Sequence, residues 1–317
     1  MERGTEDRRD RFDGLQRRVE ALERRLNAAL PRPLKVGAGV LYLHTTRGSD
    51  RLDALADRPC WVRWGDLAIA LTLAVQAAAL ALVTAGAVVA LGRDRATALN
   101  EPANTVAIPG LNEFIPVAAA GYVVAALVAA TVVHEGGHAV ACRRAGVPVR
   151  EWGVALLFGV VPLAAYVLTG DELDDAPRRA RLRVYAAAVA NNLVLAGVAF
   201  LVLLAPVTAS PMDAYLTYFG WALTGGGPPT PAAVAALGPV TNLAFWTALL
   251  SANVGLLNAL PVSVLDGGRV RSLSLAALAD RADAPLSGRT RRAVVNAAGA
   301  FAVVAVVLAV FGPLLPV

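Results

Sequence analysis

Five long apolar stretches limit what this chain can fold into more than any other feature of its sequence. Each contains about 20 mostly apolar residues, the length that an α-helix needs to cross the hydrocarbon core of a bilayer. The stretches cover residues 115–141 and 184–204, roughly 67–91 and 237–260, and 293–308 or slightly beyond. Since 56% of the 317 residues are hydrophobic and only 17% are charged, the composition excludes an ordinary soluble domain and predicts a membrane protein with several spans.

A sixth apolar stretch, residues 154–168, is too short to span a bilayer and contains Gly159 and Pro162. We expect it to form a strand or hairpin that dips into the membrane. The expected fold class is an all-α polytopic membrane protein with about five to six transmembrane helices, a short membrane-associated β-hairpin and an N-terminal amphipathic helix.

Residues 1–33 form a charged segment with an apolar repeat. The apolar side chains recur at spacings of four and three, at Leu15, Val19, Leu22, Leu26 and Leu30. This spacing predicts an amphipathic or coiled-coil helix that ends at Pro31 and Pro33. The pattern fits two roles equally well: an exposed helix that packs on the rest of the protein, or a contact for self-association.

Residues 34–66 are expected to connect this helix to the membrane. Within them we expect a short strand over 36–46 and a polar connector over 51–63. Residues 67–317 then form the membrane-embedded domain. The two cysteines, Cys60 and Cys142, are too few for a disulfide framework.

The arginines indicate how the chain lies in the membrane. They gather next to the expected spans, in residues 143–150, 178–183 and 269–292, whereas residues 206–239 contain neither Lys nor Arg. The positive-inside rule makes the arginine-rich segments cytoplasmic, which predicts a multi-pass protein of the cell membrane with a cytoplasmic N-terminus and an external C-terminus. Arg93 and Arg95 count against this scheme.

The charged N-terminus also bears on targeting and partners. Because residues 2–25 are highly charged, we expect no cleavable signal peptide. The lipid bilayer is the expected surrounding, and we expect no nucleic-acid partner.

The second apolar stretch ends in the motif His134-Glu135-Gly136-Gly137-His138. Histidines four apart share one helix face, about 6 Å apart, which suits two nitrogen ligands of one zinc ion. Glu135 follows the first histidine and is placed to act as general base on a water at the metal. His and Glu are rare in membrane spans, and they are usually functional there, so the motif predicts hydrolysis in or beside the bilayer. The alternative is a buried polar cluster that holds helices together.

A catalytic zinc site usually has three protein ligands and a water. His44 lies before the first span, and Cys142 lies about 12 Å along the helix axis from His134, too far to share one ion. Other acidic residues, Asp171, Asp174 and Asp175, lie in a polar loop.

Asp266 is the remaining candidate for the third ligand. It closes the apolar stretch that starts at residue 255, where a carboxylate is costly unless it is paired or bound to a cation. Gly267 and Gly268 allow a tight turn beside it. We therefore expect Asp266 to complete a site for a single Zn²⁺ in the chain, although for Asp266 alone a cap or turn role would be usual.

Several further segments match motifs of a known protein family. They are Ile108-Pro109-Gly110-Leu111-Asn112 with Ile115-Pro116, the segments 161–167 and 185–192, Asn258-Ala259-Leu260-Pro261 and Leu265-Asp266-Gly267-Gly268. Together with the histidine motif, they resemble the site-2 protease family of intramembrane zinc metalloproteases over most of the chain after residue 36. The resemblance implies that His134, His138 and Asp266 bind zinc and that Glu135 is the catalytic glutamate.

The resemblance also implies roles for membrane asparagines. Asn258, and Asn191 or Asn192, look like the family asparagines that bind the substrate backbone or the transition-state oxyanion. An interhelical hydrogen bond, worth about 1 kcal/mol, explains Asn258 equally well and is favoured for the pair. The segment 159–167 resembles a membrane-embedded strand that presents an edge to an unwound substrate.

The metal motif in an apolar stretch predicts hydrolysis at the membrane. The resemblance implies an intramembrane zinc metalloprotease that hydrolyses peptide bonds in transmembrane segments of other membrane proteins, as in regulated intramembrane proteolysis. The active site is expected toward the cytoplasmic side. One alternative is a metal transporter or metal-sensing membrane protein without protease activity, which would need polar ligands at several depths of the membrane. A proteolytically inactive scaffold is the other.

Overall fold

The computed structural model describes residues 21–37, 40–46, 49–93, 96–157, 161–170 and 172–315. Its five longest helices are each long and apolar enough, with their flanking turns, to cross a membrane. They are α3 (Cys60–Leu91), α4 (Ala120–Arg144), α6 (Arg178–Leu203), α10 (Gly238–Ala259) and α12 (Gly288–Phe311). The prediction of a polytopic helical protein with these five spans is confirmed.

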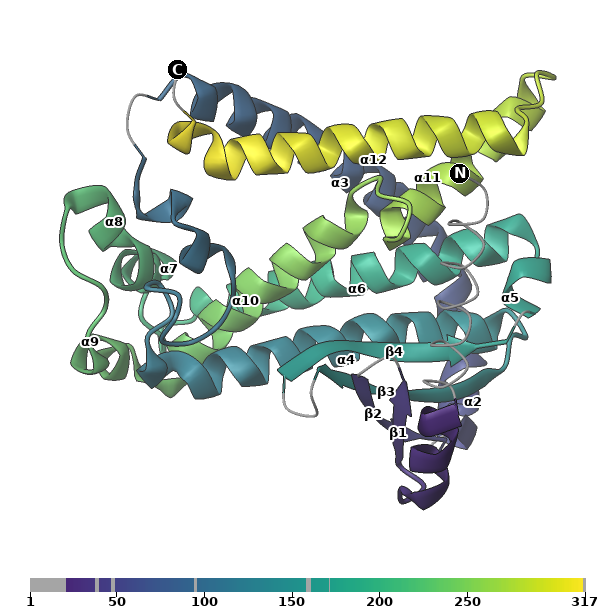
Figure 1. Cartoon of the computed structure of the whole chain (residues 1–317), viewed down its shortest axis with the longest axis horizontal. Coiled ribbons are helices and arrows are strands. Elements are labelled where there is room, and N and C mark those ends of the chain that lie inside the picture. The colour runs from purple at the N-terminus through teal and green to yellow at the C-terminus, as the bar shows by residue number, and fades with distance from the viewer. Residues whose placement is uncertain are drawn as a thin grey trace, which may run out of the picture.

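The long helices pack side by side in layers (Figure 1). The most extensive helix contacts join α6 to α10 and to α4, and α12 to α3. Helix α6 lies at the centre of this arrangement and is buried without a break over residues 184–190. Four of these seven side chains are alanine, and small side chains let neighbouring backbones approach closely, which favours helix packing in lipid.

A four-stranded antiparallel sheet lies beside α4, with the strand order β1-β2-β3-β4. Its strands are β1 (Leu34–Gly37), β2 (Val40–Thr45), β3 (Val149–Leu157) and β4 (Val161–Thr169). The predicted hairpin over 154–168 is confirmed, and its strands are longer than expected. Strand β4 is at the edge of this sheet, and α4 packs against it.

The prediction of one short strand over 36–46 is wrong. The chain reverses between Gly37 and Val40, so this segment forms a hairpin of two strands, and β2 pairs with β3. The segment 51–63, for which the sequence predicted only a polar connector, is helical over most of its length. It contains most of α2 (Ser49–Ala56) and the first turn of α3, and Ala56 is buried where α2 packs on α4.

The remaining elements are short, apart from α11 (Asp266–Arg281), which follows α10 after a break. They are the 3₁₀ turns Ala98–Asn100, Pro102–Thr105, Val117–Ala119 and Gly312–Leu314, the helices α5 (Glu172–Asp175), α7 (Pro211–Tyr215), α8 (Trp221–Thr224) and α9 (Pro231–Ala236), and the π-helical turn Leu216–Gly220. Residues 21–29 are also helical. Most of the predicted N-terminal helix, residues 1–20, lies outside the described residues, so its role in self-association stays a prediction.

An aromatic cluster anchors the segment that lacks Lys and Arg. The Tyr218 ring stacks on Phe245 with 5.2 Å between centroids, and the Tyr218 hydroxyl donates to Asn242 at 2.6 Å. This cluster lies at one end of the bundle, with α7, α8 and α9, while α5 and the connection from α11 to α12 lie at the other (Figure 1). The charge segregation read from the sequence therefore corresponds to two ends of the folded molecule.

Candidate metal centre

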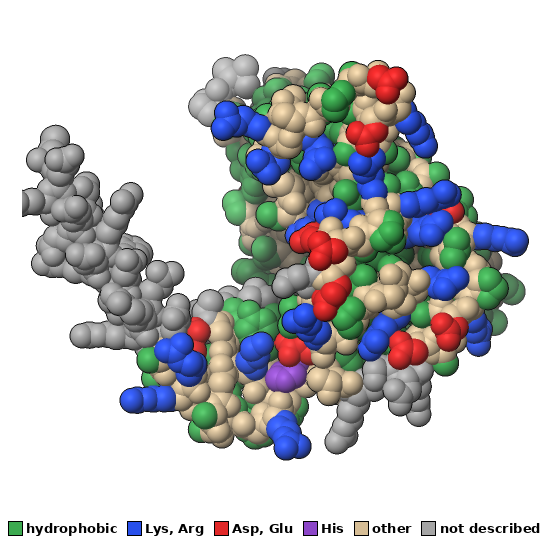
Figure 2. Space-filling model, turned by 90° about the vertical axis from the view of Figure 1, so that its right-hand side faces the viewer, with side chains coloured by type: hydrophobic (Ala, Val, Ile, Leu, Met, Phe, Trp, Pro, Cys, Tyr) green, Lys and Arg blue, Asp and Glu red, His purple; other side chains and the backbone are tan. Residues whose placement is uncertain are grey.

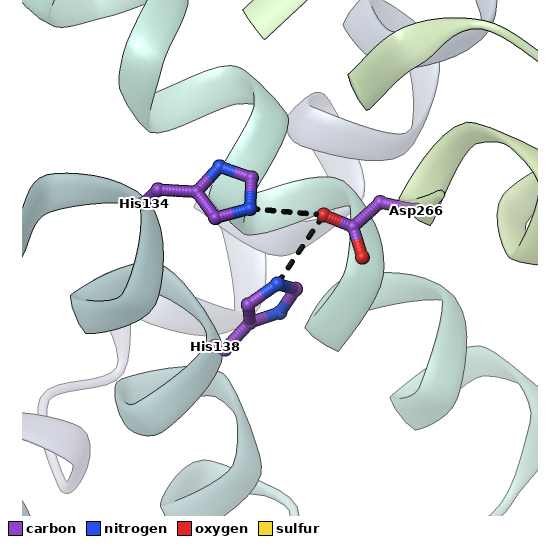
Figure 3. A group of neighbouring side chains, drawn as sticks. All are labelled: His134, His138 and Asp266. Carbon is purple, nitrogen blue, oxygen red and sulfur yellow. Dashed lines mark ion pairs between the residues drawn. The ribbon is translucent and has the colours of Figure 1, made fainter. Parts of the chain in front are cut away.

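The two histidines of the motif project from one face of α4 toward the start of α11. The Nε2 atoms of His134 and His138 both lie 3.2 Å from Oδ2 of Asp266 (Figure 3). In the described part of the chain, these three side chains form the one group of His, Cys, Asp and Glu residues placed to hold a metal ion. The two histidines are four positions apart in α4, and Asp266 follows His138 by 128 positions. The fold brings these three side chains together.

Glycine at position 137 lets α4 approach α6 at this point. A Cβ atom there would lie 2.9 Å from the Ala188 Cα and 2.8 Å from the Asn191 side chain. Both values are shorter than real Cβ contacts, so any side chain would push the helices apart. The glycine inside the motif therefore serves the packing that brings the histidines against α6.

Asp266 is held at the N-terminus of α11 by a tight chain reversal after α10. A side chain at Gly267 would collide with the Ala259 carbonyl, and one at Gly268 with the Val262 carbonyl. Gln76 of α3 spans the same reversal. Its fully buried amide donates to the carbonyl oxygens of Ala259 at 2.8 Å and Gly267 at 3.0 Å.

Hydrogen bonding at His138 supports a metal rather than a proton between the three side chains. Nδ1 of His138 lies 3.0 Å from the Val184 carbonyl oxygen, which can only accept, so this nitrogen carries the hydrogen. When the ring is neutral, Nε2 therefore presents a lone pair toward Asp266. Although Oδ2 of Asp266 lies within hydrogen-bonding distance of both rings, it has no hydrogen-bond partner of acceptable geometry among the described residues. Two nitrogens and one oxygen without a shared proton suit a divalent cation.

Asn192 lies behind the other ring. Its Nδ2 is 3.2 Å from Nδ1 of His134, and its Oδ1 is buried without a hydrogen-bond partner in the described part of the chain. The oxygen and nitrogen of an amide are assigned from hydrogen bonds, and a half-turn of this amide would place Oδ1 against Nδ1. His134 would then donate from Nδ1 and direct its Nε2 lone pair at the metal, the arrangement usual for ligating histidines.

Glu135 lies beside the three side chains but is not one of the group. It is half-buried, and the backbone N–H of Val167 in β4 faces its carboxylate. The edge strand of the sheet and the glutamate of the motif therefore meet next to the candidate metal centre.

The other two asparagines have hydrogen-bond partners outside the three candidate ligands. Asn191 accepts a hydrogen bond from Nε1 of Trp64 in α3 at 2.9 Å, the interhelical contact that the sequence offered as an alternative. Asn258 donates to the Val254 carbonyl of its own helix at 3.0 Å. Roles for Asn191, Asn192 and Asn258 in substrate binding stay predictions.

Residues rejected from the ligand set also lie elsewhere. His44 pairs with Gly153 in the sheet, Cys142 is buried with Val147 and Val184, and Asp174 pairs with Arg181 at 3.1 Å. Sequence reasoning missed Gln76. Its signal was present, because it is the one amide side chain in the apolar stretch 67–91.

Comparison with known proteins agrees with this geometry. The family described as Peptidase family M50 matches residues 122–306, more than half of the chain. The chain is 33% identical over 186 residues to the protein named "Putative zinc metalloprotease Rip3" in Mycobacterium tuberculosis, in the strains Erdman and H37Rv. The alignment covers 59% of this chain and 37% of the length of those relatives. No solved structure matches the chain. The match over the segment that carries α4, α6, α10 and Asp266 establishes that the chain belongs to Peptidase family M50, the site-2 protease family.

Proposed function

We propose that this protein is an intramembrane zinc metalloprotease that hydrolyses peptide bonds in transmembrane segments of membrane-protein substrates. The convergence of His134, His138 and Asp266 beside Glu135, within a bundle of membrane-length helices, carries this proposal. The regulated cleavage of a membrane-tethered protein is the role that the family resemblance suggests for it.

His134, His138 and Asp266 would hold the ion, because all three offer a ligand atom within 4.8 Å of the others. When bound, a zinc ion supplies a Lewis acid that polarises the scissile carbonyl and makes a water molecule more acidic. Zinc is the metal that suits a hydrolase site with two imidazoles and one carboxylate.

Glu135 moves the proton. Its carboxylate takes a proton from the attacking water as the oxygen bonds to the carbonyl carbon, and it delivers that proton to the leaving amine as the C–N bond breaks. The Val167 N–H holds the carboxylate from the side of the sheet.

Strand β4 would receive the substrate. A transmembrane helix has its carbonyl groups tied up in internal hydrogen bonds, so it has to unwind before hydrolysis. Strand β4 pairs with β3 along one edge, is the last strand of the sheet, and contacts α4 near Glu135. An extended substrate segment can gain backbone hydrogen bonds from such an edge.

The competing proposal of a metal transporter requires ligands along a path through the membrane. Among the residues that the structure describes, one group of potential metal ligands was found, at one position in the bundle. This single group favours hydrolysis.

Replacing Glu135 tests the function. We expect Glu135→Gln to lower cleavage of a model transmembrane substrate by about 10²–10⁴-fold, because the amide cannot take the water proton. The assay uses purified protein in lipid vesicles, and the control is zinc content, which should equal that of the unsubstituted chain. Equal cleavage by both proteins would rule out this mechanism.

A further inference from the structure

A cavity of about 550 Å³ lies at the arginine-rich end of the molecule, between the start of α6, α11 and the start of α12. Five arginines from these three helices line it: Arg178, Arg181, Arg269, Arg291 and Arg292. Its other polar lining residues are Tyr185, Ser263, Ser272 and Asn296, and none of the described lining residues is acidic. Figure 2 shows the basic side chains gathered on this end of the molecule.

Two of the five arginines already have carboxylate partners. Arg178 pairs with Asp280 at 2.7 Å, and Arg181 pairs with Asp174 at 3.1 Å. Both aspartates lie outside the cavity lining. The charges on these two guanidinium groups are therefore largely balanced.

The other three arginines are not balanced in this way. Arg269 donates to the Tyr185 hydroxyl at 3.3 Å and lies over that ring at 5.2 Å, contacts that leave its charge in place. No ion pair involving Arg291 or Arg292 is found in the described part of the chain, and Nε of Arg291 is buried without a hydrogen-bond partner there. Three cations that face one cavity repel one another unless an anion joins them.

The chemistry of the lining selects the anion. Guanidinium groups bind phosphate oxygens through paired hydrogen bonds, and the hydroxyl and amide groups of the lining add further donors. The cavity also lies by the first turns of α6 and α12, which begin at Arg178 and Gly288. Helix N-termini carry partial positive charge, which adds to the attraction for an anion.

The position of the cavity selects the source of the phosphate. Helices α6 and α12 are candidate membrane spans, so their ends lie at the depth of lipid head groups. Buried Leu273 and Val295 form an apolar part of the lining, and the neighbouring Val294 is 42% exposed. We propose that this cavity binds the phosphate of an anionic phospholipid head group, as basic pockets between transmembrane helices do.

Native mass spectrometry of the full chain tests this proposal with three probes: phosphatidylglycerol, phosphatidylcholine with the same acyl chains, and inorganic phosphate. We expect phosphatidylglycerol to bind more tightly than phosphatidylcholine. The double substitution Arg291→Gln and Arg292→Gln should lower its affinity by at least about tenfold. Arg281→Gln with Arg289→Gln is the matched control, since both residues are exposed and absent from the lining, and it should leave the affinity unchanged.

Three results would overturn the proposal. They are equal affinity for the two lipids, an equal effect of the two double substitutions, and arginine-dependent binding of inorganic phosphate without binding of phosphatidylglycerol. Zinc content, measured on the same samples, shows that each variant has folded, and because no cleavage is measured the outcome is independent of the protease proposal.

Discussion

Contacts on the far side of each imidazole decide which nitrogen faces the metal. The Val184 carbonyl fixes the His138 ring at 3.0 Å, and Asn192 lies 3.2 Å from the His134 ring. Outer contacts of this kind orient metal ligands and set their tautomer. We infer that Asn192, which is fully buried, is a positioning residue for His134.

Substitution of Asn192 tests this role. We expect Asn192→Leu to weaken zinc binding by about 10–100-fold, because His134 loses the partner of its Nδ1 atom. Asn192→Asp should retain binding, because a carboxylate accepts the same hydrogen. The measurement is competition with a chromophoric chelator. Asn191→Leu is the control, since Asn191 bonds Trp64 instead. Equal zinc affinity in the two leucine variants would show that Asn192 has no such role.

Helical spacing was enough to predict that His134 and His138 share a face, because both lie within one element. The contacts of Asn192 and Gln76 could not be predicted in the same way. Gln76 bonds carbonyl groups that are 183 and 191 positions away, and only the packing of α3 against the α10–α11 junction brings them together. A lone amide in an apolar helix signals some polar partner, but it does not say which.

At the scale of elements, the junction between α10 and α11 sets the position of Asp266. The junction depends on glycines that admit close backbone approach and on the Gln76 amide that satisfies two buried carbonyl groups. An unsatisfied buried carbonyl costs about 1–3 kcal/mol. We therefore expect α3, although it supplies no ligand, to stabilise the metal centre.

Gln76→Leu tests this coupling. We expect it to lower the thermal midpoint of unfolding and to reduce the rise in that midpoint on adding zinc, because the free carbonyl groups loosen the Asp266 turn. Thr84→Val on the same helix is the control, since Thr84 bonds only the Leu80 carbonyl one turn away. A zinc-induced rise as large in Gln76→Leu as in the control would contradict the coupling.

The five spans could be predicted from the sequence because the length of an apolar stretch alone determines them. The hairpin of β1 and β2 could not be predicted, because β2 also pairs with β3, a strand more than 100 residues later in the chain. Helix α2 was missed because its segment looked polar. Among the residues of α2 whose burial is described, only Ala56 is buried, and the helix packs on α4.

At the scale of the whole molecule, the basic and the Lys/Arg-free segments lie at opposite ends of the bundle. Cys60 is exposed and is the first residue of α3. It lies at the basic end, because the next residue, Trp61, lines a cavity together with Arg144 and Arg183. The positive-inside rule then predicts that Cys60 faces the cytoplasm.

Thiol labelling tests this orientation. We expect a membrane-impermeant maleimide to label Cys60 in permeabilised cells and not in intact cells. Cys142 is buried and should stay unlabelled in the folded protein, so Cys60→Ser should abolish labelling. Labelling of Cys60 in intact cells would contradict the proposed topology.

A divalent cation held by two imidazoles and one carboxylate is central to the proposed protease function. X-ray absorption at the zinc edge of the purified full chain measures this site most directly. We expect about one zinc per chain, with two imidazole nitrogens and a carboxylate oxygen at about 2.0–2.2 Å. Asp266→Ala should remove the oxygen ligand or the metal, while Asp175→Ala, an exposed residue of α5, should change neither. A spectrum without imidazole ligands, or one unchanged by Asp266→Ala, would contradict the assignment.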